Sequence, residues 1–435
     1  MARLSDDCFA GEDRPMRLDE ALATLLPRLP VLAGIERVPL VQALDRILAE
    51  DVTARIDVPA ADNSAVDGYA VWFADLDPRN ETRLPVGGRA AAGHPLDRPA
   101  RRGEAIRIFT GAPMPAGEKA ADKANDTPGG PDTVLMQEDC VERDGVVTIG
   151  PGIARGANRR RAGEDLACGT VALAAGTRLR PQDIGLAASL GATGLAVRTR
   201  LRIALFSTGD EIAEPGRSLE PGRIYDSNRY TLAALLTQLG LDVGDLGILP
   251  DRRDAVAAAL VDAARDHDAI ITSGGVSVGE EDHVKAAVAA HGRIHLWRLA
   301  IKPGRPVALG QIGSGTASRP FFGLPGNPVA VGVTFLRLVR PMLLKLMGAS
   351  RLEPHMFRVR ADFTHRKKPA RREWVPARLV ADGSGGLVAQ KFAHPGAGIL
   401  RSLVEADGLV ELPEDLTELA PGTPVDFLPF SEVSR

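Results

Sequence analysis

Apolar and polar positions divide the chain into regions with different periodicities. Between residues 199 and 350, short apolar runs alternate with segments of helical periodicity. The expected strands cover residues 201–206, 243–248 and 269–272, and the expected helices cover 227–239, 252–265, 282–290 and 328–347. Strands that alternate with amphipathic helices predict a doubly wound α/β sheet, which binds ligands at the carboxyl ends of its parallel strands.

The regions on either side of this segment have a different pattern. Short β-like runs separated by Gly, Pro and Asp predict a β-rich module at residues 58–150. Helical periodicity at residues 17–26, 38–50 and 181–190 predicts helices in the flanking stretches 16–57 and 151–198. After residue 351, strand-sized runs at 356–363, 374–380, 387–392, 399–404, 408–412 and 425–428 predict a small C-terminal β-barrel.

Two polar stretches fit no packed element. Residues 1–15 are polar and acidic where a signal peptide would be apolar, which predicts a disordered tail. Residues 118–131 contain Pro and Gly but no large apolar side chain, which predicts a mobile surface loop.

Composition narrows the class of protein. The net charge of −3 over 435 residues gives no support for bulk binding to nucleic acid or to an anionic membrane. The three cysteines are widely spaced and form no metal-ligand pattern, which fits a reducing compartment. The most apolar segment, residues 329–347, is interrupted by Arg337, Arg340 and Lys345, so no membrane span is expected. We therefore expect a cytoplasmic protein.

The stretch at residues 269–283 has the layout of an anion or metal site. A short apolar run leads into a glycine-rich loop, then into an acidic cluster at the start of an expected helix. Gly274 and Gly275 permit positive φ and a close approach of the backbone to a ligand. The alternative is an ordinary strand-to-helix turn.

Other loops of the expected sheet also end in charged residues. Carboxylates occur at Asp210, Glu211, Asp251, Glu280, Glu281 and Asp282, and cations occur at Arg298, Lys302 and Arg305. If these loops share one rim, they form a crevice suited to a phosphate-bearing ligand and Mg²⁺. Individually, Asp251 could be a helix N-cap and the other acids first-turn charges, since helix starts favour acids. The phosphate-loop motif of P-loop NTPases is absent from the sequence.

Nine ordered blocks together carry a family resemblance. They are NSAVDGYA (63–70), IRIFTGAPMP (106–115), VLMQED (134–139), RRRAGED (159–165), LFSTGDE (205–211), IYDSN (224–228), TSGGVSVGEEDH (272–283), LAIKPGRP (299–306) and FFGLPGNPV (321–329). They closely resemble the molybdopterin molybdenumtransferases, the family of MoeA and the gephyrin E domain. The resemblance covers nearly the whole chain after the first 15 residues.

The resemblance implies a multidomain fold of α/β and β parts. These are a MogA-like molybdopterin-binding domain at residues 199–350, the inserted β-rich module, an elongated linker domain at 16–57 and 151–198, and the C-terminal barrel at 351–435. It also implies a homodimer whose active site is shared between subunits. The implied reaction inserts molybdenum from molybdate into adenylylated molybdopterin and releases AMP, with a divalent cation such as Mg²⁺. A molybdopterin adenylyltransferase is then the expected upstream partner.

Site residues are carried over by motif. The resemblance implies catalytic roles at Asp67, Thr110, Asp165, Glu211, Asp251, Asp282 and Lys302. Of these, Glu211, Asp251 and Asp282 are also the expected metal ligands. Substrate contacts are expected at Arg160, Ser273, Gly274, Gly275, Ser277, Arg298, Arg305, Pro325, Asn327 and Pro328. In this family Asp67 and Thr110 face the site of the partner subunit.

Two departures from the family pattern affect the expected site. Arg298 stands where some relatives have Lys, which keeps the charge but changes the geometry. Residues 118–131 look like an insertion beside the block that contains Thr110.

Two other functions remain open at this stage. A molybdopterin adenylyltransferase would share the α/β domain but would lack the NSAVDGYA module. A catalytically silent scaffold would bind molybdopterin without inserting molybdenum.

Overall fold

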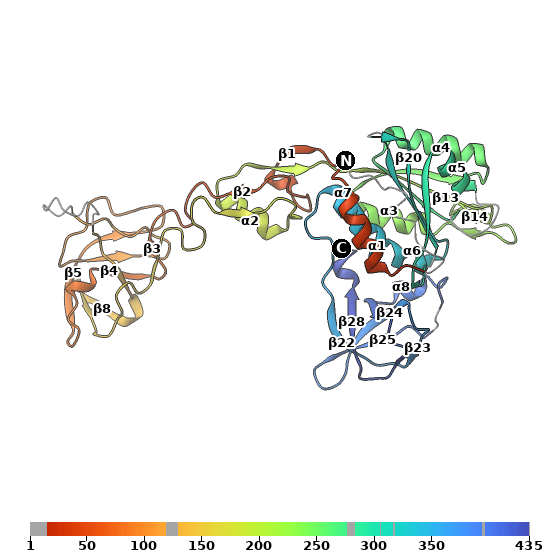
Figure 1. Cartoon of the computed structure of the whole chain (residues 1–435). Coiled ribbons are helices and arrows are strands. Elements are labelled where there is room, and N and C mark those ends of the chain that lie inside the picture. Colours follow the sequence, from red (N-terminus) through yellow and green to blue (C-terminus); the bar gives the residue numbers. More distant parts are fainter. Residues whose placement is uncertain are drawn as a thin grey trace. The chain divides into compact units, whose positions relative to one another are not determined.

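The computed structural model describes residues 15–118, 129–275, 283–304, 306–315, 318–393 and 396–434, and the side chains of residues 295–298 are not described. The chain forms two compact units (Figure 1). Unit 1 comprises Met1–Glu50, Ala175–Leu179 and Gly194–Arg435, and unit 2 comprises Asp51–Ala174 and Arg180–Thr193. Most of the expected N-terminal tail and residues 119–128 of the expected loop lie outside the described residues.

The centre of unit 1 is a mixed sheet with the strand order β16-β13-β17-β21-β20-β18. Its strands are β13 (Arg202–Thr208), β16 (Asp242–Leu249), β17 (Ala269–Ser273), β18 (Gly292–Arg298), β20 (Pro306–Ile312) and β21 (Arg319–Leu324). The β16-β13-β17-β21 part is parallel, whereas β20 runs antiparallel to both of its neighbours. The strands expected from the apolar runs are therefore confirmed.

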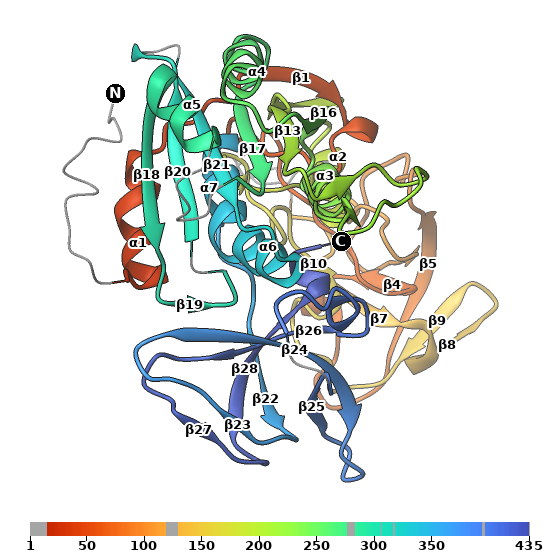
Figure 2. The same cartoon turned by 90° about the vertical axis from the view of Figure 1, so that its right-hand side faces the viewer.

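Helices cover both faces of this sheet, as Figure 2 shows. The helices are α1 (Leu18–Leu25), α3 (Asn228–Gln238), α4 (Arg253–Asp266) and α5 (His283–His291). Phe206 and Ile270 pack with α4 and α5, whereas Leu205 and Ile271 on the alternate positions pack with α1 and α3. Because successive strand residues point to opposite faces, two apolar layers follow from near-continuous apolar strands, and the doubly wound architecture is confirmed.

The expected helix at residues 328–347 is present but is not uniform. It runs as α6 (Pro328–Thr334), a π-helical segment η7 (Phe335–Val339) and α7 (Arg340–Met347), and it ends at Gly348 with φ +87°. Pro328 occupies the first helical position, where its missing N–H costs nothing. Among the described helices, none is long and apolar enough to cross a bilayer.

The C-terminal part of unit 1 is a closed β-barrel. Its order is β24-β25-β22-β28-β26, and β26 pairs back to β24. The strands are β22 (Phe357–Ala361), β24 (Arg372–Ala381), β25 (Leu387–Lys391), β26 (Gly408–Leu412) and β28 (Pro424–Pro429). The short strands β23 (His365–Arg366) and β27 (Glu418–Leu419) pair with each other.

The barrel is joined to the α/β part of unit 1 by backbone pairing and by a shared core. Strand β19 (Ile301–Lys302) pairs in parallel with the start of β24. Trp374, Leu409 and Leu428 of the barrel belong to the same buried cluster as Leu336 and Leu343 of the long helix. The α/β part and the barrel are therefore one packed body within unit 1.

Two expectations from periodicity were wrong. Residues 38–50 do not form a helix, because β1 (Ile35–Pro39) pairs with β12 (Gly194–Arg198) and Asp45 has φ +61°. Residues 399–404 do not form a strand, because the chain makes the short helix α8 (Arg401–Val404) instead. In both places partners remote in sequence, or a local turn, override the apolar spacing.

Unit 2 is built on a second mixed sheet with the order β7-β4-β6-β5-β9-β8. Its strands are β4 (Gly68–Val71), β5 (Thr82–Ala90), β6 (Ala105–Ile108), β7 (Thr133–Met136), β8 (Cys140–Arg143) and β9 (Val146–Ile149). Outside this sheet, β2 (Val52–Thr53) pairs with β11 (Val171–Leu173), and β3 (Asn63–Ser64) pairs with β10 (Arg159–Arg160). Helix α2 (Pro181–Ser189) occupies the expected stretch. Elements distant in sequence thus frame the loop that contains NSAVDGYA.

Candidate functional site

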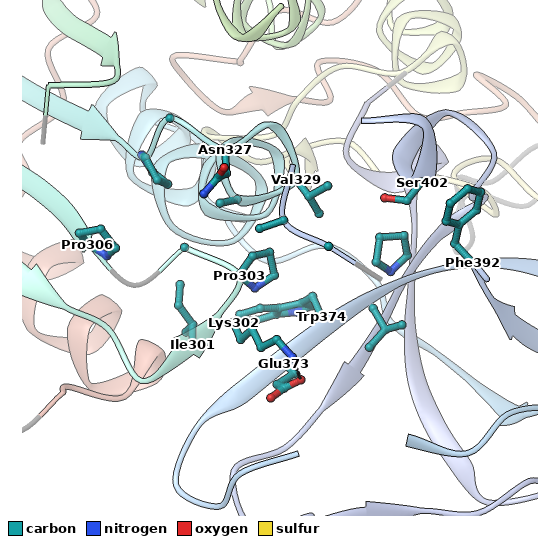
Figure 3. Close-up of a pocket in the computed structure, with 18 of the residues that line it drawn as sticks. Ile301, Lys302, Pro303, Pro306, Asn327, Val329, Glu373, Trp374, Phe392 and Ser402 are labelled. Atoms are coloured by element: carbon teal, nitrogen blue, oxygen red, sulfur yellow. Dashed lines mark hydrogen bonds and ion pairs between the residues drawn. The ribbon is translucent and has the colours of Figure 1, made fainter. Parts of the chain in front are cut away.

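A cavity of about 890 Å³ lies in unit 1 between the carboxyl ends of the parallel strands and the barrel (Figure 3). The α/β part contributes Glu211, Gly274, Gly275, Lys302, Pro325 and Asn327, all of which were expected site residues. The barrel and its loops contribute His365, Glu373, Trp374, Lys391, Phe392 and Ser402, among others. A cavity at this edge of an α/β sheet is the usual position of a ligand site.

The other expected residues of unit 1 are distributed differently. Ser273 is buried at the end of β17, and Pro328 follows the lining residue Asn327. Asp251 does not belong to the described lining. Asp282, Ser277, Arg305 and the side chain of Arg298 lie outside the described residues.

The carboxylate of Glu211 is folded back over the preceding turn. Gly209 has φ +142°, and a Cβ atom there would lie 2.5 Å from Oε2 of Glu211. Only a residue without a side chain therefore leaves room for the carboxylate in this position. The turn also carries the backbone hydrogen bond from Ile224 N to Glu211 O, which joins it to β15 (Ile224–Tyr225).

Asp251 is positioned by the neighbouring strand and does not cap the following helix. Its Oδ1 accepts a hydrogen bond from the hydroxyl of Thr208 at 3.3 Å. The N-cap of α4 is Arg252, which makes no side-chain capping bond. Among the described residues, no group of three His, Cys, Asp or Glu side chains forms a metal cluster.

The glycines after β17 hold the backbone against the neighbouring strands. Gly274 has φ +90°, and its N–H donates to Leu324 O at 3.1 Å. A Cβ atom at this position would lie 2.7 Å from the carbonyl oxygen of Thr208. A side chain would therefore displace the loop at the floor of the cavity.

The start of α6 is less open to an anion than its sequence indicates. Pro328 has no N–H, and the N–H of Val329 already donates to Ala397 O at 2.9 Å. The loop before the helix is held by Asn228, whose side-chain amide donates to Gly326 O at 2.7 Å. Anion binding in this cavity must therefore depend more on side-chain cations than on the helix start.

Glu373 is the centre of a buried charge cluster in the cavity wall. Its Oε2 is 3.3 Å from Nζ of Lys302 and 3.1 Å from Nε2 of His365. Its Oε1 accepts from Nε of Arg371 at 2.7 Å and forms an ion pair with Nη2 of Arg371 at 2.5 Å. The carboxylate is 2% exposed, whereas the side chain of Lys302 is 50% exposed at the cavity. Figure 3 shows Lys302 reaching toward Glu373.

The protonation of Glu373 reflects this surrounding charge. Burial by itself disfavours the carboxylate, but the hydrogen bond with His365, the charge of Lys302 and the contacts of Arg371 outweigh that cost. Together they lower the pKa of Glu373 from 4.5 to about 2. Glu373 is therefore an anion at any physiological pH, and it partly neutralises the cationic wall.

The barrel residues of this wall were missed from sequence. Trp374 packs beside Glu373, and its indole Nε1 donates to Oε2 of Glu411 at 2.8 Å. Lys391 Nζ donates to Thr364 O at 2.8 Å. The available signal was the run of basic residues at 366–372, which ends next to a Glu-Trp pair at the start of a strand.

In unit 2 the structure brings Asp67 and Thr110 into direct contact. Oδ1 of Asp67 accepts from both the backbone N–H and the hydroxyl of Thr110, each at 2.8 Å. These bonds, the backbone one first, lower the pKa of Asp67. Arg107 lies nearby, stacked between the rings of Tyr69 and Phe109.

Arg160 ends strand β10 of unit 2, and Asp165 lies in the loop that follows it. Arg160 is the register partner of Asn63, and the N–H of Asp165 donates to Val58 O at 3.0 Å. Asp62 accepts from the N–H of Ala162 at 2.8 Å, which closes the turn against the NSAVDGYA loop. The two motifs, far apart in sequence, thus meet through β3 and β10.

Comparison with known proteins agrees with this architecture. Residues 16–191 match the family model "MoeA N-terminal region (domain I and II)", residues 204–345 match "Probable molybdopterin binding domain", and residues 358–430 match "MoeA C-terminal region (domain IV)". The class defined by this fold and cavity is therefore a multidomain enzyme built around a molybdopterin-binding type of α/β domain.

Relatives of similar length define the family. Molybdopterin molybdenumtransferase of Haemophilus influenzae is 36% identical over 420 residues, which cover 96% of this chain and 99% of the relative. Molybdopterin molybdenumtransferase 2 of Mycobacterium tuberculosis is 37% identical, with coverage of 89% and 93%. A crystal structure of the molybdopterin biosynthesis MoeA protein of Pyrococcus horikoshii superimposes with a TM-score of 0.78 at 27% identity, covering 95% of this chain and 99% of that one. This chain belongs to the MoeA family of molybdopterin molybdenumtransferases.

Proposed function

We propose that this protein transfers molybdenum from molybdate to adenylylated molybdopterin and releases AMP, as the last common step of molybdenum cofactor synthesis. The observation that carries the proposal is the cavity between the carboxyl ends of the parallel strands and the barrel, whose lining includes Lys302 from the α/β part and His365 and Lys391 from the barrel. A cation-lined cavity of about 890 Å³ fits a tetrahedral oxyanion together with part of a larger phosphate-bearing ligand.

The proposed chemistry depends on positioning and charge. Lys302 binds the oxyanion, and the neighbouring cations oppose the charge that develops when the phosphoanhydride of the adenylyl group is cleaved. Water attacks one phosphorus of the anhydride and forms the new P–O bond as the P–O–P linkage breaks, so AMP leaves with one phosphate and the other phosphate stays on molybdopterin. Gly274 and Gly275 allow the backbone to approach the ligand closely.

A divalent cation fits the acids around β13. Glu211 and Asp251 are hard oxygen donors on the two loops beside Thr208, and Mg²⁺ typically takes one or two protein carboxylates plus substrate oxygens. Together with Asp282 they would hold Mg²⁺, which supplies charge neutralisation at the anhydride. We expect Asp282→Ala to abolish AMP release while the protein remains folded.

The remaining part of the proposed site comes from a second copy of the chain. Asp67 and Thr110 lie on two loops at one end of the paired strands β4 and β6 of unit 2 and are bonded to each other. We propose that a homodimer brings these two residues to the cavity of the partner. The proposed setting is the cytoplasm, with a molybdopterin adenylyltransferase supplying the substrate.

The decisive experiment supplies the purified protein with adenylylated molybdopterin, molybdate and Mg²⁺, and measures AMP and molybdenum cofactor together. Equimolar formation of both products is expected. Synthesis of adenylylated molybdopterin from molybdopterin and ATP would instead identify an adenylyltransferase. Binding of molybdopterin without any turnover would identify a scaffold.

A further inference from the structure

The acid in the cationic wall opposes the ligand that the wall is proposed to bind. Glu373 is 2% exposed and lies within 3.3 Å of Nζ of Lys302, the half-exposed cation at the cavity. An oxyanion bound to Lys302 must therefore share that ammonium group with a carboxylate that is already present. Two negative charges separated by a few ångströms in a partly buried site repel each other strongly.

Packing alone does not account for an acid at this position. Burying a carboxylate has a large desolvation cost, which is offset only where charged partners and hydrogen bonds surround it. Arg371 and His365 help to offset that cost, because they occupy Oε1 and Oε2 from the barrel side. The carboxylate is thus held in place by the barrel while it faces Lys302 of the α/β part.

We propose that Glu373 is a built-in competitor for Lys302 that weakens oxyanion binding so that the bound anion can be passed on. This inference rests on the proposed function, in which molybdate is a substrate that must leave its first binding position. Tight binding of the ground state would lower KM for molybdate but would also raise the barrier from the bound state. Glu373 is therefore a positioning residue that sets affinity.

The charge dependence of binding tests the proposal directly. Repulsion by Glu373 grows in proportion to the charge of the ligand. In Glu373→Gln, we expect the affinity for the tetrahedral monoanion perrhenate to rise about tenfold, and that for the dianion molybdate by roughly the square of that factor. Both dissociation constants are measured by calorimetry on the full-length protein.

Two matched variants control for the substitution itself. Glu414→Gln removes another buried acid of the barrel, which pairs with Arg17 and Arg372 outside the cavity lining. It is expected to leave both affinities within about twofold of wild type, because it lies outside the wall. Glu373→Asp keeps the charge but withdraws it from Lys302, and a smaller gain in molybdate affinity is expected. If Glu373→Gln fails to fold, Glu373→Asp carries the test.

Turnover separates this role from a merely structural one. In Glu373→Gln, KM for molybdate and kcat are both expected to fall, so that kcat/KM changes little. A residue that only supports the fold would raise KM. Unchanged or weaker molybdate binding in folded Glu373→Gln, with wild type still binding molybdate, overturns the competitor role alone. Wild-type protein that neither binds molybdate nor inserts molybdenum overturns the proposed function as well.

Discussion

The acid at the cavity of unit 1 and the acid of the Asp67–Thr110 pair in unit 2 are held by different surroundings. Glu373 is enclosed by the barrel and surrounded by Lys302, His365 and Arg371. The side chain of Asp67 accepts two hydrogen bonds from Thr110, and its backbone carbonyl accepts one from Gln137 N. The first arrangement needs the α/β part and the barrel to meet, whereas the second needs only the paired strands β4 and β6, which bring together two residues 43 positions apart in the chain.

This difference indicates separate roles: the cavity of unit 1 controls how tightly the anion binds, and the Asp67–Thr110 pair of unit 2 contributes to turnover. A buried cluster of charges acts through a low dielectric, so its members control how strongly an anion is held. The Asp67–Thr110 pair, whose members bond to each other, does not enclose a ligand by itself. We therefore expect substitutions in the cavity to alter the affinity for molybdate, and substitutions in the Asp67–Thr110 pair to alter turnover alone.

The largest expected effect is the loss of the half-exposed cation. Lys302→Ala should reduce kcat/KM for molybdenum insertion on the order of 10³-fold, because it removes a charge aimed at the anionic ligand. Molybdate binding, measured by calorimetry, should be lost in parallel. Lys368→Ala, an exposed lysine of a nearby barrel loop, is the control and should behave like wild type. If Lys302→Ala kept the molybdate affinity of the wild type, the cavity would not be the site that controls anion binding.

The next effect concerns stability at low pH. The folded pKa of Glu373 is about 2 and its ordinary value is 4.5, so the unfolded chain takes up the proton first as pH falls. Its contribution, at most about 3 kcal/mol, is present above pH 5 and is lost progressively between pH 5 and pH 2.

Fluorescence can assign this loss to one unit. Trp72 lies in unit 2, whereas Trp297 and Trp374 lie in unit 1, so Trp72→Phe confines the signal to unit 1. Unfolding of that variant in urea should become easier as pH falls toward 2. The same series with Glu373→Gln added should show a flatter dependence. An equal slope with and without Glu373 would show that its cluster does not stabilise unit 1.

The smallest expected effect is a loss of turnover on substitution of Asp67 in unit 2. Asp67→Asn keeps an oxygen that can accept from Thr110 but removes the charge. We expect turnover to fall about 30-fold, a typical loss for one positioned polar group, with molybdate affinity unchanged.

Mixed dimers extend this test to the partner contribution. If Asp67 acts on the cavity of another copy, co-expression of Asp67→Asn with Lys302→Ala should restore activity above that of either variant alone, because one of the two mixed sites is intact. No recovery in such dimers would place both residues in the site of a single chain.

The strands and helices of the α/β sheet could be predicted from the sequence because each is encoded by a local pattern of apolar residues. Each strand is a short run of apolar residues such as Ala269–Ser273, and each helix follows with its own periodicity. The glycines at 274 and 275 and Lys302 were identified for the same reason, since the ends of such strands form one edge. The resemblance then added Asp67 and Thr110, whose contact no local pattern predicts.

Glu373 and Trp374 could not be found in the same way. On the strand β24 they read as an ordinary polar and apolar pair, and their burial arises only because the barrel closes against the α/β part. The failed helix at 38–50 has a similar cause. Val38, Pro39 and Leu48 pair with β12, more than 100 positions away in the chain, and propensity alone does not encode that partner.

The two-residue strand β19 provides the backbone pairing between the α/β part and the barrel. Glu373 is the register partner of both Lys302 and Leu412, so the barrel ladder and the attachment to the sheet meet at one residue. Because this backbone pairing is only two residues long, its hydrogen bonds can open while the shared core and the closed barrel ladder stay intact. Amide hydrogen exchange at Arg372, whose N–H donates to Ala300 O at 2.8 Å, should therefore be faster than within the barrel and should report this local fraying at the edge of the cavity.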